Sequence, residues 1–353
     1  MTGKLQRIAT LPVAEEDLTP EFLGQALGHT IAALAPSGAI RGTGTKLFFD
    51  VTYTDADTDG PASICVKGGF GERVRSFGVA EAYVLEAIFY GDIAPRTTLR
   101  LPTCYYAAID NQRTQGIVIL EDLRDTGHTF GEPTEPWTPD AVAAGLEQQA
   151  KWHAATWNAA ADPQGLGLAV GSTSVRAAAP VLFSTEHVER QRVVPELAPL
   201  FAHLPDAAGF RLAFSALWAW DDAQHLCLVH GDAHVGNTFL DTSGAPGFLD
   251  WQCPCLGPWS YDVAYFLVGA LEIADRREHQ EELLRGYLTN LSAYGGPNLS
   301  YEEAFEAYRR SNLHGTFWAL TPPEMQPIER VSVMAERHVA AVVDLDTFGA
   351  LRV

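Results

Sequence analysis

Alternating apolar and polar residues predict β-strands in the first third of the chain. In the stretch KLFFDVTY, Leu47, Phe49 and Val51 share one side of an extended segment, while the residues between them point to the other side. In the following stretch ASICVKGGF, the same alternation places Val66 on one face and Lys67 on the opposite face. Lys67 is therefore predicted to point away from the core face of a sheet.

The next two stretches predict a helix and a hairpin. SFGVAEAYVLEAIFYGDI combines helix-forming residues with apolar positions at helical spacing, and Glu81 and Glu86 are its candidate inward-facing acids. TCYYAAIDNQRTQGIVILEDL predicts a hairpin whose apolar second strand runs into Glu121 and Asp122. The first part of the chain is thus predicted to be an antiparallel sheet with one helix.

Helical spacing dominates the rest of the chain. DAVAAGLEQQAKWHAATWNAA predicts a core-facing helix, and further helical patterns fill 181–225 and 258–345. We interpret His153, on the core side of the first of these helices, as a buried core residue. The expected fold class is α+β and bilobal, with an N-terminal lobe over 1–122 and a larger, mainly helical C-terminal lobe over 123–353.

Composition and charge narrow the classes of function. The chain has 353 residues, 47% of them hydrophobic, so it can bury a large core. A formal net charge of −20 argues against a protein that wraps nucleic acid, because phosphate backbones require a basic groove. The sequence has no signal-peptide pattern and no apolar run of membrane length, so we expect a cytoplasmic protein without membrane contact. Nothing in the sequence indicates an oligomeric state.

The cysteines do not indicate a disulfide framework. There are five of them, an odd number scattered along the chain. Cys253 and Cys255 form a C-P-C pair, but no second pair follows at the spacing of a structural zinc site.

The stretch LVHGDAHVGNTFLDTSGAPGFLDWQ carries the strongest candidate chemistry. A short apolar strand leads into a loop at Asp232, Asn237 follows five residues later, and a hairpin ends at Asp250. Oxygen ligands of this kind suit Mg²⁺, which is usually held by one or two carboxylates together with substrate phosphates. Asn237 and Asp250 are the candidate metal ligands, and Asp232 is the candidate base for a substrate hydroxyl. The alternative is that such residues only form turns, which we accept for Asp241 and Ser243.

Two glycines before the first predicted strand are candidates for phosphate binding. Gly42 and Gly44 in RGTGTK lack side chains, so their backbone amides can approach an anion closely. Taken alone, the pattern fits an ordinary turn better, and the chain contains no G-x-x-x-x-G-K-[ST] phosphate-binding loop.

These motifs together resemble a known superfamily. HGDAHVGN followed by FLDWQ resembles the catalytic loop and metal-binding segment of the aminoglycoside phosphotransferase and choline kinase superfamily, which shares the protein-kinase-like fold. Gly231 stands where protein kinases have an arginine, and D-W-Q stands where they have D-F-G, which favours a small-molecule acceptor. CLGPWSYDVAYFL extends the resemblance and implies that Asp262 supports the catalytic loop. The F-Y after Glu86, LEDL and DWQ are most similar to the ecdysteroid-kinase-like branch.

The resemblance also implies roles for the nucleotide-binding residues. Lys67 is similar to the lysine that binds nucleotide phosphates, and Glu86 to the helix glutamate that pairs with it. Backbone groups around Glu121 to Leu123 are implied to contact the adenine ring. The implied cofactors are ATP and Mg²⁺, and the implied reaction transfers the γ-phosphate to a hydroxyl group of a small molecule.

The acceptor stays open among an aminoglycoside, a macrolide, a choline-like amino alcohol and a steroid-like alcohol, and the branch resemblance favours the last. Aromatic and acidic residues of the C-terminal lobe are candidates for its pocket: Trp218, Trp220, Asp221, Asp222, Trp259, Tyr261 and Trp318. The alternative is that most of these tryptophans belong to the core and the acids to the solvated surface. The alternative function is a nucleotide-binding pseudokinase that acts as a binding module. The absence of any one of four residues would favour that alternative, and all four are present: Lys67, Asp232, Asn237 and Asp250.

Overall fold

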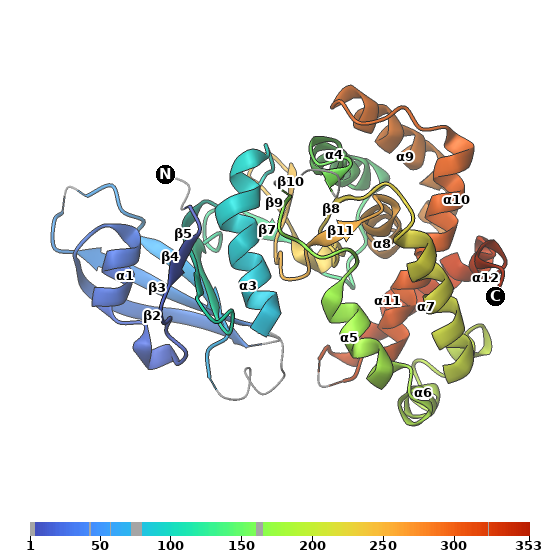
Figure 1. The fold of residues 1–353 in the computed structure, drawn as a ribbon, viewed down its shortest axis with the longest axis horizontal. Coiled ribbons are helices and arrows are strands. Elements are labelled where there is room, and N and C mark those ends of the chain that lie inside the picture. Colours follow the sequence, from blue (N-terminus) through green and yellow to red (C-terminus); the bar gives the residue numbers. More distant parts are fainter. Residues whose placement is uncertain (1–3, 42–43, 57, 72–79, 160–164, 324) are drawn as a thin grey trace. The chain divides into compact units, whose positions relative to one another are not determined.

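The chain folds into two compact units (Figure 1). The computed structural model describes residues 4–41, 44–56, 58–71, 80–159, 165–323 and 325–353. The first unit comprises Met1–His128 and Leu249–Cys253, and the second comprises Thr129–Phe248 and Pro254–Val353. The short segment Leu249–Cys253, which contains Asp250, therefore packs with a unit that is distant from it in sequence.

A six-stranded sheet forms the centre of the first unit, in the order β1-β5-β6-β4-β3-β2. Neighbouring strands are antiparallel, except that β1 runs parallel to β5. The strands are β1 (Gln6–Ile8), β2 (Ile31–Arg41), β3 (Thr45–Tyr53), β4 (Ser63–Gly68), β5 (Cys104–Asp110) and β6 (Gly116–Glu121). The predicted strands and hairpin are confirmed.

Strand β2 was not predicted, and its position explains why. It is one of the two edge strands of the sheet, it is mostly exposed, and it contains Pro36 and Gly38. Edge strands tolerate proline because one side of the backbone faces solvent. An exposed edge strand also needs no alternation of apolar and polar residues, so the sequence lacked the usual signal.

One face of the sheet packs against helix α1 (Pro20–Leu27). Leu47 and Ile64 of the sheet share a buried cluster with Leu23 of this helix. The hydroxyl of Thr19 caps the helix by accepting a hydrogen bond from the Phe22 amide at 3.2 Å. The helix ends at Gly28 with φ +77°, a backbone conformation that favours glycine. A 3₁₀ turn, η1 (Glu15–Asp17), precedes α1.

The opposite face of the sheet packs against helix α3 (Ala80–Ile88), which lies across the sheet from α1 in Figure 1. The helix continues through a π-helical turn, η2 (Phe89–Ile93), and a 3₁₀ turn, η3 (Ala94–Arg96). All its residues from Ala82 to Ile88 are buried. The predicted helix is confirmed, although the first residues of the predicted stretch lie outside the described ones.

The second unit is mainly helical, which confirms the α+β fold class. Its helices are α4 (Pro139–Ala155), α5 (Thr173–Leu182), α6 (Thr185–Arg192), α7 (Ala207–Asp221), α8 (Ser260–Ala270), α9 (Ile273–Ala293), α10 (Tyr301–Ser311), α11 (Ile328–Asp344) and α12 (Thr347–Leu351). The 3₁₀ segments η5 (Leu200–Ala202) and η7 (Asn312–Leu320) lie between them. Hydroxyl or carboxylate side chains cap five of these helices by accepting from a first-turn amide: Thr138, Ser172, Ser184, Asp206 and Ser300.

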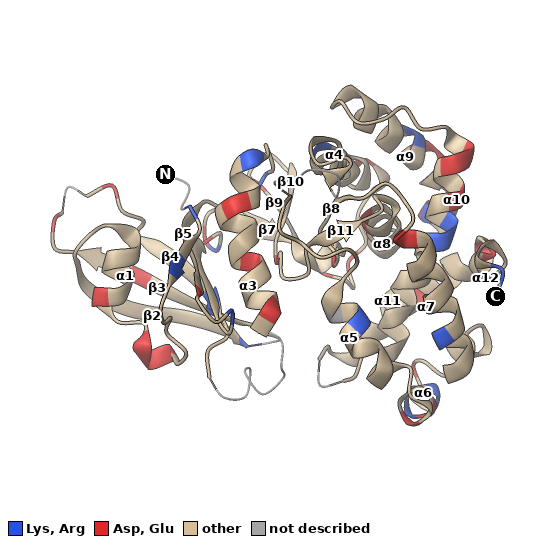
Figure 2. Cartoon of the chain, in the orientation of Figure 1, with Lys and Arg blue, Asp and Glu red and all other residues tan. Residues whose placement is uncertain are grey.

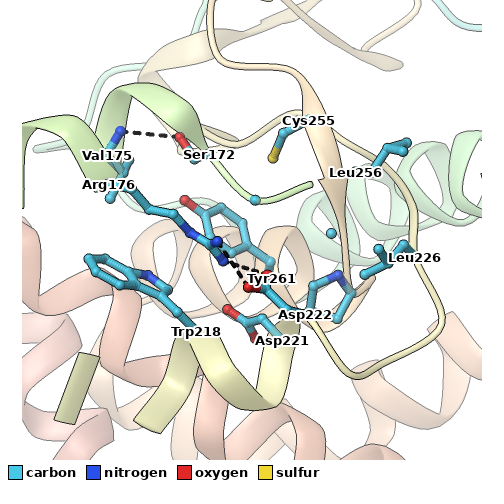
Figure 3. Close-up of a pocket in the computed structure, with 13 residues that line it drawn as sticks. Ser172, Val175, Arg176, Trp218, Asp221, Asp222, Leu226, Cys255, Leu256 and Tyr261 are labelled. Atoms are coloured by element: carbon cyan, nitrogen blue, oxygen red, sulfur yellow. Dashed lines mark hydrogen bonds and ion pairs between the residues drawn. The ribbon is translucent and has the colours of Figure 1, made fainter. Parts of the chain in front are cut away.

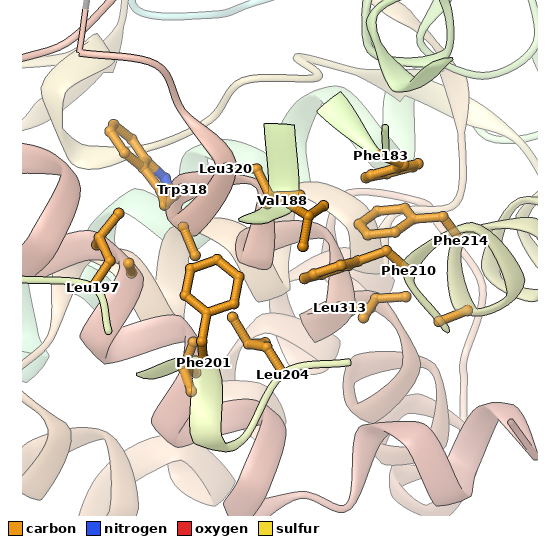
Figure 4. Close-up of a cluster of buried hydrophobic side chains, with 14 of the residues drawn as sticks. Phe183, Val188, Leu197, Phe201, Leu204, Phe210, Phe214, Leu313, Trp318 and Leu320 are labelled. Carbon is orange, nitrogen blue, oxygen red and sulfur yellow. The ribbon is translucent and has the colours of Figure 1, made fainter. Parts of the chain in front are cut away.

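A large buried cluster of this unit joins α5, α6, α7, η7 and α11 (Figure 4). The Phe183 ring stacks on Phe214 with centroids 4.8 Å apart and lies parallel to Phe210. Trp318 belongs to the same cluster, so this candidate acceptor residue is part of the core.

Two small sheets hold the polar loop of the second unit. Strands β7 (Thr129–Phe130), β9 (Thr238–Leu240) and β10 (Pro246–Phe248) form one of them. Strands β8 (Cys227–Val229) and β11 (Cys255–Gly257) form the other, and a 3₁₀ turn, η6 (Val235–Asn237), lies between β8 and β9. The predicted strand, loop and hairpin of this stretch are confirmed.

Charged residues are spread over many elements of both units (Figure 2). The formal net charge of −20 is therefore not concentrated in one segment. None of the helices in the described ranges is long and apolar enough to cross a membrane.

Candidate active site

Lys67 and Glu86 form a buried ion pair between strand β4 and helix α3. The Lys67 ammonium donates to Glu86 Oε1, and the two side chains are only 5% and 3% exposed. Burial acts to lower the pKa of Lys67, but the carboxylates of Asp250 and Glu86 outweigh it and hold that pKa above its usual value. The first unit therefore contains a lysine that stays positively charged and is held in one position.

Asp250 accepts hydrogen bonds from two lysines. Its Oδ1 lies 2.8 Å from Lys67 Nζ, and its Oδ2 lies 3.0 Å from Lys46 Nζ. Burial alone would raise the pKa of Asp250, but Lys46 and Lys67 reverse that effect and hold the pKa well below its usual value. The carboxylate is thus ionised at neutral pH.

The backbone of Asp250 has a φ of +62°, which lies in the left-handed region that Asp tolerates better than most residues.

The neighbours of Asp250 in the same segment also pack into the first unit. Trp251 is fully buried and stacks on Phe89, with ring centroids 3.8 Å apart and planes at 5°. Gln252 Nε2 donates to Glu86 Oε2 at 3.5 Å. The segment is therefore attached to α3 and η2 by the two residues that follow Asp250.

Of the two predicted phosphate-binding glycines, one can be placed. A side chain at Gly44 would come within 2.8 Å of Gln252 Nε2, so the absence of a side chain permits a close approach of these two residues. Gly42 lies outside the described residues.

Glu121 and Leu123, the predicted adenine contacts, lie at and just beyond the end of β6. The Glu121 amide donates to the Thr103 carbonyl at 2.8 Å, and the Glu121 carboxylate accepts from the Thr103 hydroxyl at 2.9 Å. The Leu123 carbonyl accepts from the Thr126 hydroxyl at 2.6 Å. These bonds fix the local backbone, and the adenine contact stays a prediction.

Asp262 supports the loop that follows β8 in the second unit. Its Oδ2 accepts from the His230 amide at 2.6 Å, and its Oδ1 accepts from the Gly231 amide at 3.0 Å. His153 Nε2 lies 3.5 Å from Asp262, and His153 Nδ1 lies 2.9 Å from the Tyr287 hydroxyl. His153 and Asp262 are both completely buried, so the interpretation of His153 as a core residue is confirmed.

Asp232 is the accessible residue of this loop. Its side chain is 43% exposed, whereas His230 is fully buried and accepts from the Asp232 amide at 3.2 Å. Asn237 Nδ2 donates to the Asp232 carbonyl at 2.9 Å and to Asp232 Oδ2 at 3.2 Å. Because the amide nitrogen of Asn237 is directed at Asp232, its oxygen is left for another partner.

The turn that joins β9 and β10 has no such chemistry. Asp241 Oδ1 accepts from the amides of Ser243 and Ala245 and from the Ser243 hydroxyl, at 2.6 to 3.0 Å. The interpretation of Asp241 and Ser243 as turn residues is confirmed.

A small pocket of the second unit brings together four candidate acceptor residues, Trp218, Asp221, Asp222 and Tyr261 (Figure 3). Arg176 donates to both carboxylate oxygens of Asp222, at 3.0 and 2.6 Å. Asp221 is buried, its Oδ1 has no hydrogen-bond partner among the described residues, and burial raises its pKa to about 8. The free volume is about 10 Å³, which holds roughly one water molecule. The pocket as it stands is too small for an acceptor.

The remaining acceptor candidates do not join this pocket. Trp259 is buried and stacks on Tyr287, with ring centroids 5.0 Å apart. Trp220 lines a separate hollow with Arg310 and Leu351. The seven candidates therefore divide among the core and two hollows.

Two residues near Asp250 were missed in the sequence, Lys46 and Gln252. Lys46 could have been found from the strand register, because it lies directly opposite Lys67 in the antiparallel pair of β3 and β4. Gln252 gave no such signal, because its contact with Glu86 depends on the folding of Leu249–Cys253 into the first unit.

The described parts of the chain contain no group of three or more His, Cys, Asp or Glu side chains that could hold a metal ion by themselves. Mg²⁺ does not require such a group, because it keeps several waters and usually takes one or two protein carboxylates plus substrate phosphates. The ionised Asp250 and the oxygen of Asn237 are ligands of the type that Mg²⁺ prefers.

The chain is similar to a known protein family and to known structures. Residues 124–299, just under half of the chain, match the sequence model of a family described as Phosphotransferase enzyme family. A solved structure of an aminoglycoside 2'-phosphotransferase mutant with GDP has a TM-score of 0.51 and 13% identity, over 91% of this chain and 94% of that one. A type I macrolide 2'-phosphotransferase gives a TM-score of 0.46 and 18% identity, over 92% of this chain and 98% of that one.

A choline kinase from Streptococcus pneumoniae gives a TM-score of 0.47 and 15% identity, over 93% of this chain and 99% of that one. No curated protein sequence matches the chain. The chain thus has the fold of the aminoglycoside 2'-phosphotransferase, and its residues 124–299 are similar to the phosphotransferase enzyme family.

Proposed function

We propose that the protein is a small-molecule kinase, which transfers the γ-phosphate of ATP to a hydroxyl group of its acceptor. The observation that carries the proposal is the buried Lys67–Glu86 pair joined to Asp250. Burying ionised groups is costly unless each is paired, and such clusters are found more often at functional sites than elsewhere. The similarity of residues 124–299 to a phosphotransferase family supports the proposal independently.

In the proposed reaction Lys67 binds oxygens of the nucleotide phosphates, and Glu86 holds the lysine in place. Phosphoryl transfer needs little covalent work from the protein, so its rate comes from positioning and from neutralising charge on the phosphates. A lysine from a central strand, fixed by a glutamate from the covering helix, provides both. The amides near Gly42 and Gly44 are proposed to approach the phosphates, and the backbone from Glu121 to Leu123 the adenine.

Asp250 is the proposed magnesium ligand of the first unit, and Asn237 that of the second. Asp250 is ionised because of its two lysine neighbours, and the Asn237 oxygen is left open by the bonds that its nitrogen donates to Asp232. Magnesium, when bound, neutralises charge on the nucleotide oxygens.

Asp232 is the proposed catalytic residue. Its exposed carboxylate accepts the proton of the acceptor hydroxyl while the hydroxyl oxygen bonds to the γ-phosphorus and the bond to the leaving ADP breaks. The buried Asp262 fixes the backbone before Asp232, and Asn237 holds the Asp232 carboxylate from the other side. His230 is a scaffold residue in this account, because it is fully buried.

The proposed acceptor is a hydroxylated aminoglycoside, macrolide, choline-like amino alcohol or steroid-like alcohol. Solved proteins of similar fold include an aminoglycoside and a macrolide phosphotransferase and a choline kinase. The motifs around Glu86 and DWQ are most similar to the ecdysteroid-kinase-like branch, which favours a steroid-like alcohol.

The experiment that tests the proposal is magnesium-dependent release of ADP from ATP across a panel of these four acceptor classes. The wild type and Asp232→Asn are compared on every acceptor. We expect turnover with one acceptor class and a loss of that turnover in the variant. ATP binding without turnover on any acceptor would favour the binding module, and turnover by Asp232→Asn at the wild-type rate would contradict the role of Asp232.

A further inference from the structure

The two lysines beside Asp250 form a cross-strand pair. Lys46 of β3 and Lys67 of β4 are direct partners in the antiparallel register, so both side chains leave the same face of the sheet. Like charges directly opposite each other on a sheet repel. The pair therefore needs negative charge close by, and Asp250 supplies it by contacting both ammonium groups.

The two lysines depend on Asp250 to different degrees. Lys67 contacts both Glu86 and Asp250 and is 5% exposed. Lys46 is 29% exposed, and Asp250 is its one ion-pair partner among the described residues. If Asp250 binds another cation, Lys67 keeps Glu86 as a counter-charge, whereas Lys46 loses the one ion-pair partner that it has among the described residues.

The proposed function requires Asp250 to bind Mg²⁺. A carboxylate that binds a cation can no longer neutralise an ammonium group to the same extent. ATP brings several anionic oxygens to the same place, next to Lys67. The lysine ammonium has three donors on a flexible stem, so it can move from one oxygen to another nearby without a change in the backbone.

We propose that Lys46 is a second phosphate-binding lysine, which exchanges the Asp250 carboxylate for an oxygen of the nucleotide phosphates when ATP binds. This inference rests on the proposed function, and it assigns to Lys46 a role that Lys67 alone does not fill. Lys67, fixed by Glu86, defines the position of the phosphates. Lys46, released by Asp250, adds affinity that depends on the charge of the phosphates.

The test measures the dissociation constants of ATP and of adenosine, both with magnesium, by titration calorimetry. The proteins are the wild type, Lys46→Met, Lys46→Arg, and Lys151→Met as a control of equal charge change in the second unit. Lys151 pairs with Glu147 on the same helix and belongs to a different unit from Lys46. Folding of each variant is checked by its thermal unfolding transition without ligand, and Lys46→Gln replaces Lys46→Met if the latter does not fold.

We expect Lys46→Met to weaken ATP binding by about 10- to 100-fold, the range of one hydrogen bond between charged groups. Adenosine carries no phosphate for Lys46 to bind. The adenosine affinity of Lys46→Met should therefore stay within about 2-fold of the wild-type value, which is the size of effect that an ordinary surface substitution has. Lys46→Arg keeps the charge and should recover part of the loss. Lys151→Met should bind both ligands as the wild type does.

Three results would overturn the inference. In the first, the wild type binds ATP and Lys46→Met binds it equally well, which would remove the role of Lys46 and leave the proposed function intact. Equal weakening of ATP and adenosine would mean that Lys46 only supports the fold of the site. A wild type that does not bind ATP with magnesium would overturn the inference and the proposed function together.

Discussion

Different kinds of contact stabilise two polar regions of the molecule. One region is the ion cluster of the first unit (Lys46, Lys67, Glu86 and Asp250), and the other is the Asp232 loop of the second unit (230–237). In the ion cluster, charged side chains from β3, β4, α3 and a distant segment bind one another. In the loop, most hydrogen bonds join residues close in sequence and involve backbone groups, and Asp262 and Tyr261 bind the loop from outside it.

The difference has an energetic consequence. Lys67 pairs with both Glu86 and Asp250, so the loss of either carboxylate leaves Lys67 with one partner. Lys46 pairs with Asp250. Asp262 accepts from two loop amides at once, so its loss removes both of these hydrogen bonds together. We therefore expect the cluster to tolerate single changes in folding better than the loop does.

The largest expected effect separates chemistry in the loop from binding in the cluster. Asp232→Asn removes the proton acceptor and should lower kcat by about 10² to 10⁴, which is roughly 3 to 5 kcal/mol of barrier. ATP binding should persist, because the ion cluster is unchanged. Steady-state ADP release and ATP titration calorimetry measure the two quantities. A parallel loss of binding and turnover would contradict the separation of roles.

The next effect compares two buried carboxylates. Asp262→Ala removes the carboxylate that accepts from two buried amides and should cost about 2 to 5 kcal/mol of unfolding free energy. Glu86→Ala should cost less, because Lys67 keeps Asp250 as a partner. Urea unfolding of both variants measures the difference. If Glu86→Ala proved the more destabilising, the idea of shared partners in the cluster would fail.

The third effect is a contrast in pH dependence between Asp221 of the second unit and Asp250 of the cluster. The pKa of Asp221 is raised from 3.8 to about 8 by burial, so the folded protein holds this proton more tightly than the unfolded chain. Its contribution is present at acid pH and is lost as the pH rises toward 8. Asp221→Asn mimics the protonated acid. Between the pKa of the unfolded chain and pH 8, its unfolding free energy should rise relative to that of the wild type by about 1 kcal/mol per pH unit.

Asp250 should behave in the opposite sense. Its pKa is lowered in the folded state by Lys46 and Lys67, so its contribution is present at neutral pH and is lost below the ordinary pKa of an aspartate. Asp250→Asn should therefore differ from the wild type most at neutral pH and least in acid. Thermal unfolding at a series of pH values checks both variants, and the same slope for both would contradict these assignments.

The smallest expected effect concerns Gln252. Its bond to Glu86 is long, at 3.5 Å, and Glu86 is already paired with Lys67. Gln252→Ala should change unfolding free energy by about 0.5 kcal/mol or less, with little change in ATP affinity. A much larger loss of ATP affinity would assign Gln252 a direct part in nucleotide binding.

The contrast between the two regions also explains what could be predicted from sequence. The Asp232 loop is local, so the spacing of Asp232 and Asn237 along the chain already indicated their proximity. Strand alternation indicated that Lys67 leaves the face of Val66, and the register of β3 and β4 agrees. Alternation and helical spacing are also local patterns, and they predicted β3 to β6, α3 and α4.

Other features depend on contacts that are distant in sequence. The packing of Leu249–Cys253 into the first unit brings Asp250 to Lys46, and no local pattern indicates it. The division of the acceptor candidates among a core and two hollows depends on how α7, α8 and η7 pack. Composition could suggest aromatic and acidic residues for a pocket, but it could not assign Trp318 to the core.

Magnesium-dependent stabilisation by ATP tests the central claim most directly, because it requires no knowledge of the acceptor. The wild type should show a higher Tm with ATP and magnesium than with either alone, and a ligand at 100 times its Kd adds about 2.7 kcal/mol of apparent stability. Asp250→Asn should lose the magnesium-dependent part of the shift. No rise in Tm of the wild type at millimolar ATP with magnesium would contradict the account.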